Sequence, residues 1–241
     1  MFVDFSTYPD KAPDYDLRDL LEAGMHFGHN SAKWHPKMKE YIYMAKDGVH
    51  IFDLAKTAEQ LRLAYNFLFD LGAKGKKIIF VGTKRQARDL IRKSATEAGA
   101  LFIAQRWMGG MLTNWEQISK SVKRMNDIEK GLESGRFDGY TKFEKLQLEK
   151  EQGRLERFFE GIKGLNGKPD CLVVVDPKRE QLVVEEANKV GVPVVALIDS
   201  NTNPENISLP VPGNDDAVSS IEFVLNEFAK AYLEGKKTNK K

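Results

Sequence analysis

Apolar residues in the first half of the chain follow two rhythms, one after the other. Residues 78–81, IIFV, are apolar at every position, which is typical of a strand covered on both faces. In the next stretch, apolar residues recur at intervals of three and four, at Ala87, Leu90, Ile91, Ala95 and Ala98. This spacing predicts a helix with one buried face. Residues 101–103, LFI, predict the next strand.

The same order returns in residues 169–199. The apolar runs CLVVV and PVVALI stand on either side of a predicted helix that ends at Gly191. Two strand–helix–strand units predict an α/β fold, with a parallel sheet flanked by helices in the Rossmann or flavodoxin manner. Further helices are predicted over residues 56–72 and 215–233.

Between the two units the apolar positions form narrow stripes. They are spaced at three and four in residues 114–134 and again in residues 141–163, and a glycine-rich link, GLESGRFDGY, joins them. Dense, nearly balanced charges surround both stripes. Narrow seams of this kind are typical of an antiparallel coiled-coil hairpin that stands in solvent. Two ordinary helices packed on the sheet are the alternative, although such helices usually carry wider apolar faces.

These patterns divide the chain into four parts. Residues 1–113 form the first part of the α/β core with an N-terminal extension, and residues 114–164 form the projecting helical hairpin. Residues 165–233 complete the core, and residues 234–241 form a basic tail.

Composition indicates the setting in which the protein works. With 41% hydrophobic and 30% charged residues among 241, the chain has an ordinary soluble composition and enough length for a large core. The single cysteine, Cys171, lies in a predicted buried strand, and one thiol makes no internal disulfide, which fits a reducing compartment. No apolar stretch approaches the ~20 residues that span a membrane. We expect a cytoplasmic protein.

The net charge of +2 conceals two oppositely charged regions. Residues 74–106 have a balance of +7, and residues 165–229 have a balance of −7. In the first region, basic side chains recur every four residues away from the predicted apolar face: Lys84, Arg88 and Arg92, with Arg85 beside them. One interpretation is a face that binds the phosphates of a polyanion. The other is an ordinary solvated helix surface.

The sequence contains few of the groups that an enzyme would use for catalysis. The turn FVGTKR could hold a phosphate on its backbone N–H groups, but it lacks both G-x-x-x-x-G-K-[ST] and G-x-G-x-x-G, so a simple tight turn is the plainer interpretation. Acidic residues follow the later strands, at Asp176, Asp199, Asp215 and Asp216. No G-x-S-x-G motif and no reactive cysteine accompanies them.

Two loops combine tryptophan with basic residues. In the first, AGMHFGHNSAKWHPKMK, the residues suited to stacking on bases and neutralising phosphates are Lys33, Trp34, Lys37 and Lys39. The second, QRWMGGMLTNW, places Arg106 beside Trp107. We expect Trp107 and Trp115 to be mainly core anchors where the hairpin joins the body.

His29 has two interpretations. The carboxyl ends of parallel strands converge on one crevice, which predicts that Asp199 meets Asp215 or Asp216 there; His29 joins them if the first block of the chain folds over the same edge. One histidine and two carboxylates are acceptable zinc ligands, with water or a partner completing the set. The alternative is a hydrogen-bonded His–Asp pair without metal.

Five ordered blocks between residues 15 and 233 resemble the bacterial form of the small ribosomal subunit protein two family. They are LLEAGMHFGHNSAKWHPKM, IFVGTKRQA, RWMGGMLTNW, PDCLVVVDPKREQLVVEEANKVGVPVVALIDSN and PVPGNDDA. The resemblance implies a non-enzymatic α/β core with a protruding helical hairpin. It also implies contact with small-subunit ribosomal RNA between head and body and a part in docking ribosomal protein one, with no cofactor required. His35 stands where the family usually has asparagine, and residues 1–13 extend beyond the usual start.

Three functions from different classes follow from these residues. The ribosomal interpretation assigns RNA contacts to both basic sets, the one around residues 33–39 and the one at residues 84–106. Its rivals are a nucleotide- or phosphosugar-binding enzyme that uses GTKR, and a coiled-coil adaptor that uses the hairpin alone.

Overall fold

A five-stranded parallel sheet lies at the centre of the computed structural model, which describes residues 5–239 apart from the side chain of Ser6. The strand order is β5-β4-β6-β7-β8, which is 2-1-3-4-5 in chain order, the order of flavodoxin-like doubly wound folds. The predicted α/β class is therefore confirmed. The strands are β4 (Ile78–Val81), β5 (Leu101–Ile103), β6 (Cys171–Val175), β7 (Val194–Ile198) and β8 (Leu209–Pro212).

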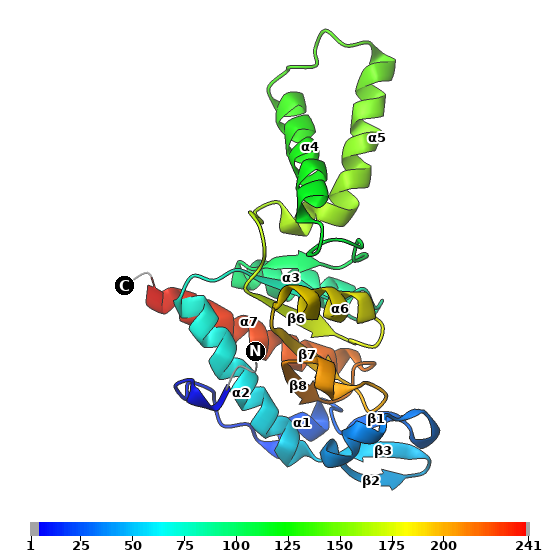
Figure 1. Ribbon diagram of the computed structural model, residues 1–241, viewed down its shortest axis with the longest axis vertical. Coiled ribbons are helices and arrows are strands. Elements are labelled where there is room, and N and C mark those ends of the chain that lie inside the picture. The colour runs from blue at the N-terminus through cyan, green and yellow to red at the C-terminus, as the bar shows by residue number, and fades with distance from the viewer. Residues whose placement is uncertain (1–4, 240–241) are drawn as a thin grey trace.

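Helices cover both faces of this sheet (Figure 1). The helices α2 (Leu54–Ala73), α3 (Arg88–Ala98) and α7 (Val218–Asn239) pack on one face, and α6 (Gln181–Val190) packs on the other. Successive side chains of a strand point to opposite faces, so Phe80 belongs to the first core cluster and Ile79 to the second. This two-sided burial explains why the strands are apolar throughout.

A second, three-stranded antiparallel sheet was not predicted. It consists of β1 (Phe27–Asn30), β2 (Ile42–Lys46) and β3 (Val49–Phe52) in the order β1-β3-β2. Both pairings contain an irregularity in register, and four of the five β2 residues are exposed. The sequence therefore lacks the regular alternation that indicates a half-buried strand. A short helix, α1 (Leu17–Glu22), precedes this sheet.

The predicted hairpin consists of α4 (Trp115–Glu133) and α5 (Lys142–Phe159), which project from the body (Figure 1). Thr141 and Glu144 form a capping box that starts α5. The outer half of the hairpin has its own small apolar cluster, built on Ile128, Phe137 and Leu148.

The inner half of the hairpin belongs to the body. Val122 and Met125 of α4 join Phe159 and Ile162 in the core cluster that covers the α6 face of the sheet. The division between core and hairpin therefore does not lie at residue 114. We infer that only the outer part of the hairpin, beyond about residue 126, is stabilised by an apolar cluster of its own.

The described residues near both ends of the chain belong to the folded body. The helix α7 continues to Asn239, so residues 234–239 extend a helix and are no separate tail; residues 1–4 and 240–241 lie outside the described part. Near the other end, Asp10 pairs with Arg62, and the backbone N–H groups of Lys11 and Ala12 donate to Asn66 Oδ1. These contacts hold residues 10–12 of the N-terminal extension against α2.

No helix within residues 5–239 is long and apolar enough to cross a membrane.

Candidate functional site: the carboxyl edge of the sheet

Most of the predicted site residues lie around one edge of the parallel sheet. Lys84 and Arg85 follow the carboxyl end of β4, and Arg106 follows that of β5. Asp199 follows β7, and Asp215 follows β8. The loop of residues 31–37 reaches the same edge, since the backbone N–H of His35 donates to Ser200 O at 2.8 Å. Arg92 is the exception, one helical turn beyond Arg88 on α3.

Lys84 is buried, so its prediction as part of an exposed basic stripe is wrong. Its ammonium lies 2.8 Å from Asp215 Oδ1, 2.5 Å from Asp216 Oδ1 and 3.4 Å from Asp176 Oδ2. Residue 84 precedes α3, which begins at Arg88, so the helical spacing of four that linked it to the stripe does not apply. Burial alone would lower the pKa of Lys84, but the surrounding carboxylates raise it above its usual value.

The turn after β4 already holds an anion from the chain itself. The backbone N–H and the hydroxyl of Thr83 both donate to Glu180 Oε1, at 2.9 and 2.5 Å. Burial raises the pKa of Glu180, while the bonds from Thr83 act in the opposite direction. With Lys84 also engaged, the groups expected to cradle a phosphate at this turn are taken by Glu180 and the aspartates.

His29 is held against Asp199 and Ser200 by three hydrogen bonds. Its Nδ1 lies 2.8 Å from Asp199 Oδ2, and its backbone N–H donates to Asp199 Oδ1 and to Ser200 Oγ, each at 2.9 Å. Glycine before it favours this close approach, because a Cβ on Gly28 would lie 3.0 Å from Ser200 Oγ, which would have to shift. The bond to Asp199 raises the pKa of His29 against the opposing effect of burial. The predicted His–Asp contact is therefore present.

The four residues predicted to hold a metal come together. One ligand atom from each of His29, Asp199, Asp215 and Asp216 lies within 4.8 Å of the others. His29 Nε2 is 3.6 Å from Asp216 Oδ2, and Asp215 Oδ2 is buried without a hydrogen-bond partner among the described residues. Burial, and then Asp176 and Asp199, raise the pKa of Asp215 to about 7, although Lys84 opposes the shift.

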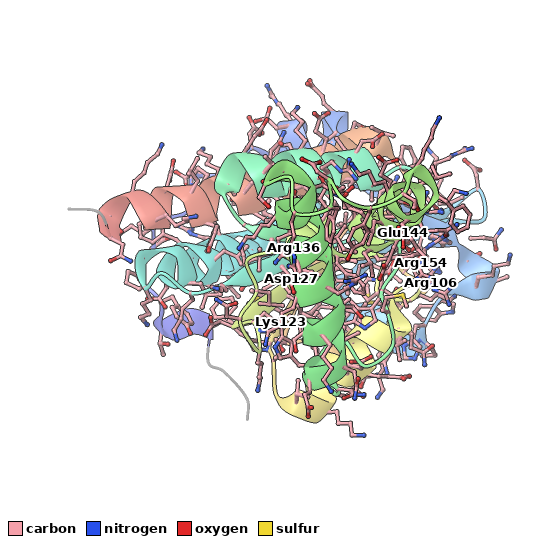
Figure 2. All side chains as sticks on the ribbon, turned by 90° about the horizontal axis from the view of Figure 1, so that it is seen from above. Arg106, Lys123, Asp127, Arg136, Glu144 and Arg154 are labelled. Atoms are coloured by element: carbon pink, nitrogen blue, oxygen red, sulfur yellow. The ribbon has the colours of Figure 1, made fainter. Side chains whose placement is uncertain are left out.

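The predicted RNA-binding arginines differ in how firmly the chain already holds them. Arg88 Nε donates to Thr83 O at 2.9 Å. Arg92 lies over the ring of Phe102, and its guanidinium is 3.6 Å from Glu160. Within residues 5–239, by contrast, no hydrogen bond or ion pair engages Arg85 or Arg106, both of which are exposed. In the view down the hairpin, Arg106 lies on the side where α5 stands (Figure 2).

The basic set at residues 33–39 is mostly open to solvent. Lys33, Lys37 and Lys39 are exposed, although Lys37 pairs with Glu205, and Trp34 is half-buried against His50 at a ring distance of 5.2 Å. His35 caps the short helical turn that follows, accepting on Nδ1 from the N–H of Lys37 at 3.3 Å. An asparagine oxygen would serve the same purpose, so His35 preserves the local geometry.

A buried glutamate that the sequence reasoning missed organises the loop of residues 107–113. Glu186 accepts hydrogen bonds from Trp107 Nε1, from the backbone N–H groups of Gly110, Leu112 and Thr113, and from the Thr113 hydroxyl, at 2.7–3.2 Å. Burial acts to raise the pKa of Glu186, but these donors lower it overall. The only signal was an acidic residue at a position that the helix period assigns to the apolar face, between Val183 and Ala187. Trp107 is 5% exposed, and Trp115 packs against the same core cluster, as expected of core anchors.

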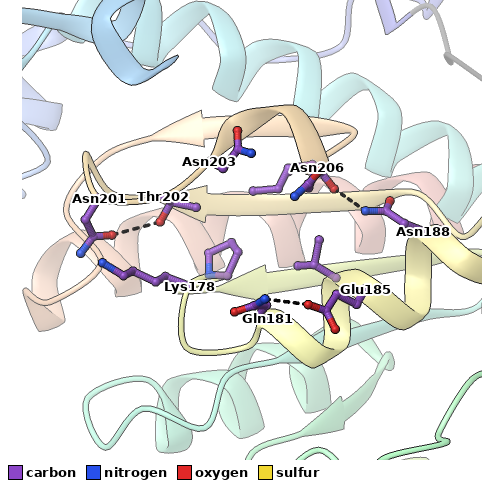
Figure 3. A pocket seen from close by; sticks show the side chains of 11 residues that line it. Lys178, Gln181, Glu185, Asn188, Asn201, Thr202, Asn203 and Asn206 are labelled. Atoms are coloured by element: carbon purple, nitrogen blue, oxygen red, sulfur yellow. Dashed lines mark hydrogen bonds between the residues drawn. The ribbon is translucent and has the colours of Figure 1, made fainter. Parts of the chain in front are cut away.

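A hollow of about 240 Å³ opens beside the edge, between α6 and the loop after β7 (Figure 3). Its amide side chains mostly bond within the chain: Gln181 donates to Glu185, Asn188 donates to Asn206 O, and Asn201 accepts from Thr202. Its lining contains neither a histidine nor a cysteine, and no serine lies there to act as a nucleophile.

Together the fold and its edge define an α/β protein with exposed cations beside a projecting helical hairpin and a buried lysine in the acidic crevice of the sheet edge. The family model described as "Ribosomal protein S2" matches residues 20–235. The chain is 45% identical over 223 residues to "Small ribosomal subunit protein uS2" of Paramagnetospirillum magneticum, covering 92% of this chain and 84% of that protein. It is also 45% identical over 219 residues to the protein of the same name from Koribacter versatilis, covering 91% and 73%.

The chain therefore belongs to the ribosomal protein S2 family, and it is a structural, non-enzymatic component of the small ribosomal subunit. The resemblance noted in the sequence is confirmed, and the enzyme and adaptor interpretations are wrong.

Proposed function

We propose that the chain binds small-subunit ribosomal RNA at the junction of head and body, in ribosomes of the cytoplasm, through the carboxyl edge of its sheet. The observation that carries this proposal is the pair of exposed, unengaged guanidinium groups of Arg85 and Arg106, which follow the ends of the neighbouring strands β4 and β5. Guanidinium groups fit phosphate oxygens in two-point geometry. Lys33 and Lys39 extend the cationic edge on the β7 side, with Trp34 available for a base.

The salt dependence of subunit association tests this contact. Replacing Arg85 and Arg106 by alanine should weaken association and reduce the slope of log affinity against log salt by about 0.7–0.9 for each phosphate that the protein no longer neutralises. Lys230→Ala is the matched control, since Lys230 is an exposed cation on α7 away from the edge. A slope that stays the same in the double variant would contradict the proposal.

For ribosomal protein one we propose a docking surface on the small antiparallel sheet. Phe27, Ile51 and Met44 lie opposite one another across β1, β3 and β2, so their side chains share one face of the sheet. Phe27 is 49% exposed and Met44 is 47% exposed, which leaves an apolar row open to a partner.

Sedimentation of ribosomal protein one with reconstituted small subunits tests this surface. The double variant Phe27→Ser, Met44→Ser should retain less of that protein on the subunit, whereas Leu182→Ser, which removes an exposed apolar side chain from α6, should retain the normal amount. Equal retention by wild type and both variants would overturn the assignment.

We also propose that the crevice formed by His29, Asp199, Asp215 and Asp216 binds a zinc ion. The supporting observation is that Asp215 Oδ2 is buried without a hydrogen-bond partner among the described residues. Metal-binding histidines usually donate their second ring N–H to a carboxylate, and His29 Nδ1 beside Asp199 has that arrangement. His29 Nε2, Asp215 and Asp216 then become the ligands. The 3.6 Å between Nε2 and Asp216 Oδ2 is close to the roughly 3.3 Å expected between ligands of a tetrahedral zinc.

Elemental analysis of the purified protein and of its ribosome-bound form tests the metal. We expect about one zinc per chain, lost in Asp215→Asn and kept in the control His35→Gln. Less than about a tenth of an equivalent in both wild-type samples would leave a metal-free His–Asp pair as the answer.

A further inference from the structure

The foot of the hairpin has a hollow of about 290 Å³ outside the edge described above. It lies between α4 and the segment that follows α5. The aromatic and polar residues of its lining include Trp115, Lys123, Asn126, Lys163 and Asn166. Trp115 packs partly against the core cluster of the α6 face, and the rest of its indole borders the hollow. The aromatic ring is thereby fixed in position by the body while part of it stays accessible.

Most of the polar side chains around Trp115 have no hydrogen-bond or ion-pair partner among the described residues. Within residues 5–239, no hydrogen bond engages the side chains of Trp115, Asn126 or Asn166. Lys123 is exposed and unpaired in the same range and extends from α4 (Figure 2), whereas Lys163 pairs with Glu129 at 2.7 Å. The hollow therefore offers a stacking surface, two amides and a free cation.

This combination is that of a site for single-stranded nucleic acid. Aromatic rings stack on unpaired bases, amides bond to base edges, and lysines neutralise the adjoining phosphates. A protein partner is less well matched, because lysine is depleted in the centres of protein–protein interfaces. None of these residues belongs to the two basic sets of the carboxyl edge, so the hollow is a separate contact.

We propose that this hollow binds one unpaired base of the small-subunit RNA, stacked on Trp115, with Asn126 and Asn166 on its edge and Lys123 on its phosphate. The proposal rests on the proposed function, since it names a second RNA contact of the same protein. It assigns the foot of the hairpin the recognition of a base, whereas the arginines of the edge bind phosphates.

Base-specific chemical probing of reconstituted small subunits tests the proposal. With Trp115→Leu, which keeps an apolar side chain against the core, one unpaired base or two adjacent ones should become about tenfold less protected, the effect of removing one aromatic stack. Trp115→Phe should restore most of the protection. Asn126→Ala and Lys123→Ala should expose the same bases, and the control Lys120→Ala, which removes a lysine of α4 paired with Glu116 outside the hollow, should not.

The outcomes separate this proposal from the one on which it rests. If Trp115→Leu lowers stability, the variants at Asn126 and Lys123, on the solvent side of α4, decide the matter. Normal incorporation with an unchanged protection pattern in all three variants would overturn the base contact and leave RNA binding intact. A photocrosslink from position 115 to a neighbouring protein would overturn it too. Wild-type protein that fails to sediment with the subunit would overturn both proposals.

Discussion

Replacing Glu186 by glutamine tests what holds the loop of residues 107–113 in place. The carboxylate is 5% exposed and accepts hydrogen bonds from one indole N–H, three backbone N–H groups and one hydroxyl. Glutamine keeps one oxygen but turns an NH₂ group toward donors that then have no acceptor. At about 1–3 kcal/mol for each buried donor left without a partner, two such donors cost ~2–6 kcal/mol.

Thermal and denaturant unfolding measure this loss. For a chain of this size, 1 kcal/mol shifts Tm by about 2–4 °C, so Glu186→Gln should lower Tm by ~4–24 °C. The neighbouring Glu185→Gln is a matched control, because Glu185 is exposed and bonds only to Gln181 within the described residues. A loss below about 0.5 kcal/mol, no larger than an ordinary surface substitution, would refute the reasoning.

The same comparison has a predicted pH dependence. The pKa of Glu186 is lowered from its ordinary value of 4.5, so the folded state binds this proton more weakly than the unfolded state does. The stability that the carboxylate contributes is therefore complete above 4.5 and is lost as pH falls below it, toward the folded pKa. Wild type and Glu186→Gln should converge in stability over that acidic range. A gap that stays constant on acidification would contradict the assignment of a charged acceptor.

Three further perturbations test other parts of the structure by denaturant unfolding. Lys84→Met should cost ~3–5 kcal/mol because it strands a buried carboxylate, and adding Asp215→Asn should recover much of the loss; a double variant as unstable as the single one would refute the pairing. Replacing residues 127–148 by a short glycine-serine linker should leave cooperative unfolding of the body, whereas replacing residues 116–162 should abolish it; equal behaviour of the two would show that the division within the hairpin is wrong. Gly28→Ala should cost ~1–3 kcal/mol, because its Cβ would lie 3.0 Å from a serine hydroxyl, and a neutral effect would contradict that close approach.

The sequence by itself determined those strands and helices that the spacing of neighbouring apolar residues predicts. Apolar runs marked β4, β6 and β7 because both faces of a central parallel strand are buried, and spacings of three and four marked α3, α6 and the hairpin. Predicted and observed hairpin helices agree within a few residues, at 114–134 against Trp115–Glu133 and 141–163 against Lys142–Phe159. The meeting of the strand-end aspartates also followed from sequence, because strand direction sends those ends to one edge, whereas the approach of His29 depended on the first block folding over that edge.

Only the tertiary structure determined which polar groups form hydrogen bonds and ion pairs with one another. Lys84 carries the same charge as Arg85 beside it, and it is buried away from solvent because Asp215, 131 positions away, is brought within 2.8 Å. Glu186 likewise reaches donors 73–79 positions away. Side-chain periodicity reports the face on which a residue lies and carries no information about the partner that the packing places there. The strands β1, β2 and β3 were not predicted for a related reason, since short strands with irregular register are fixed by pairing with one another rather than by their own pattern.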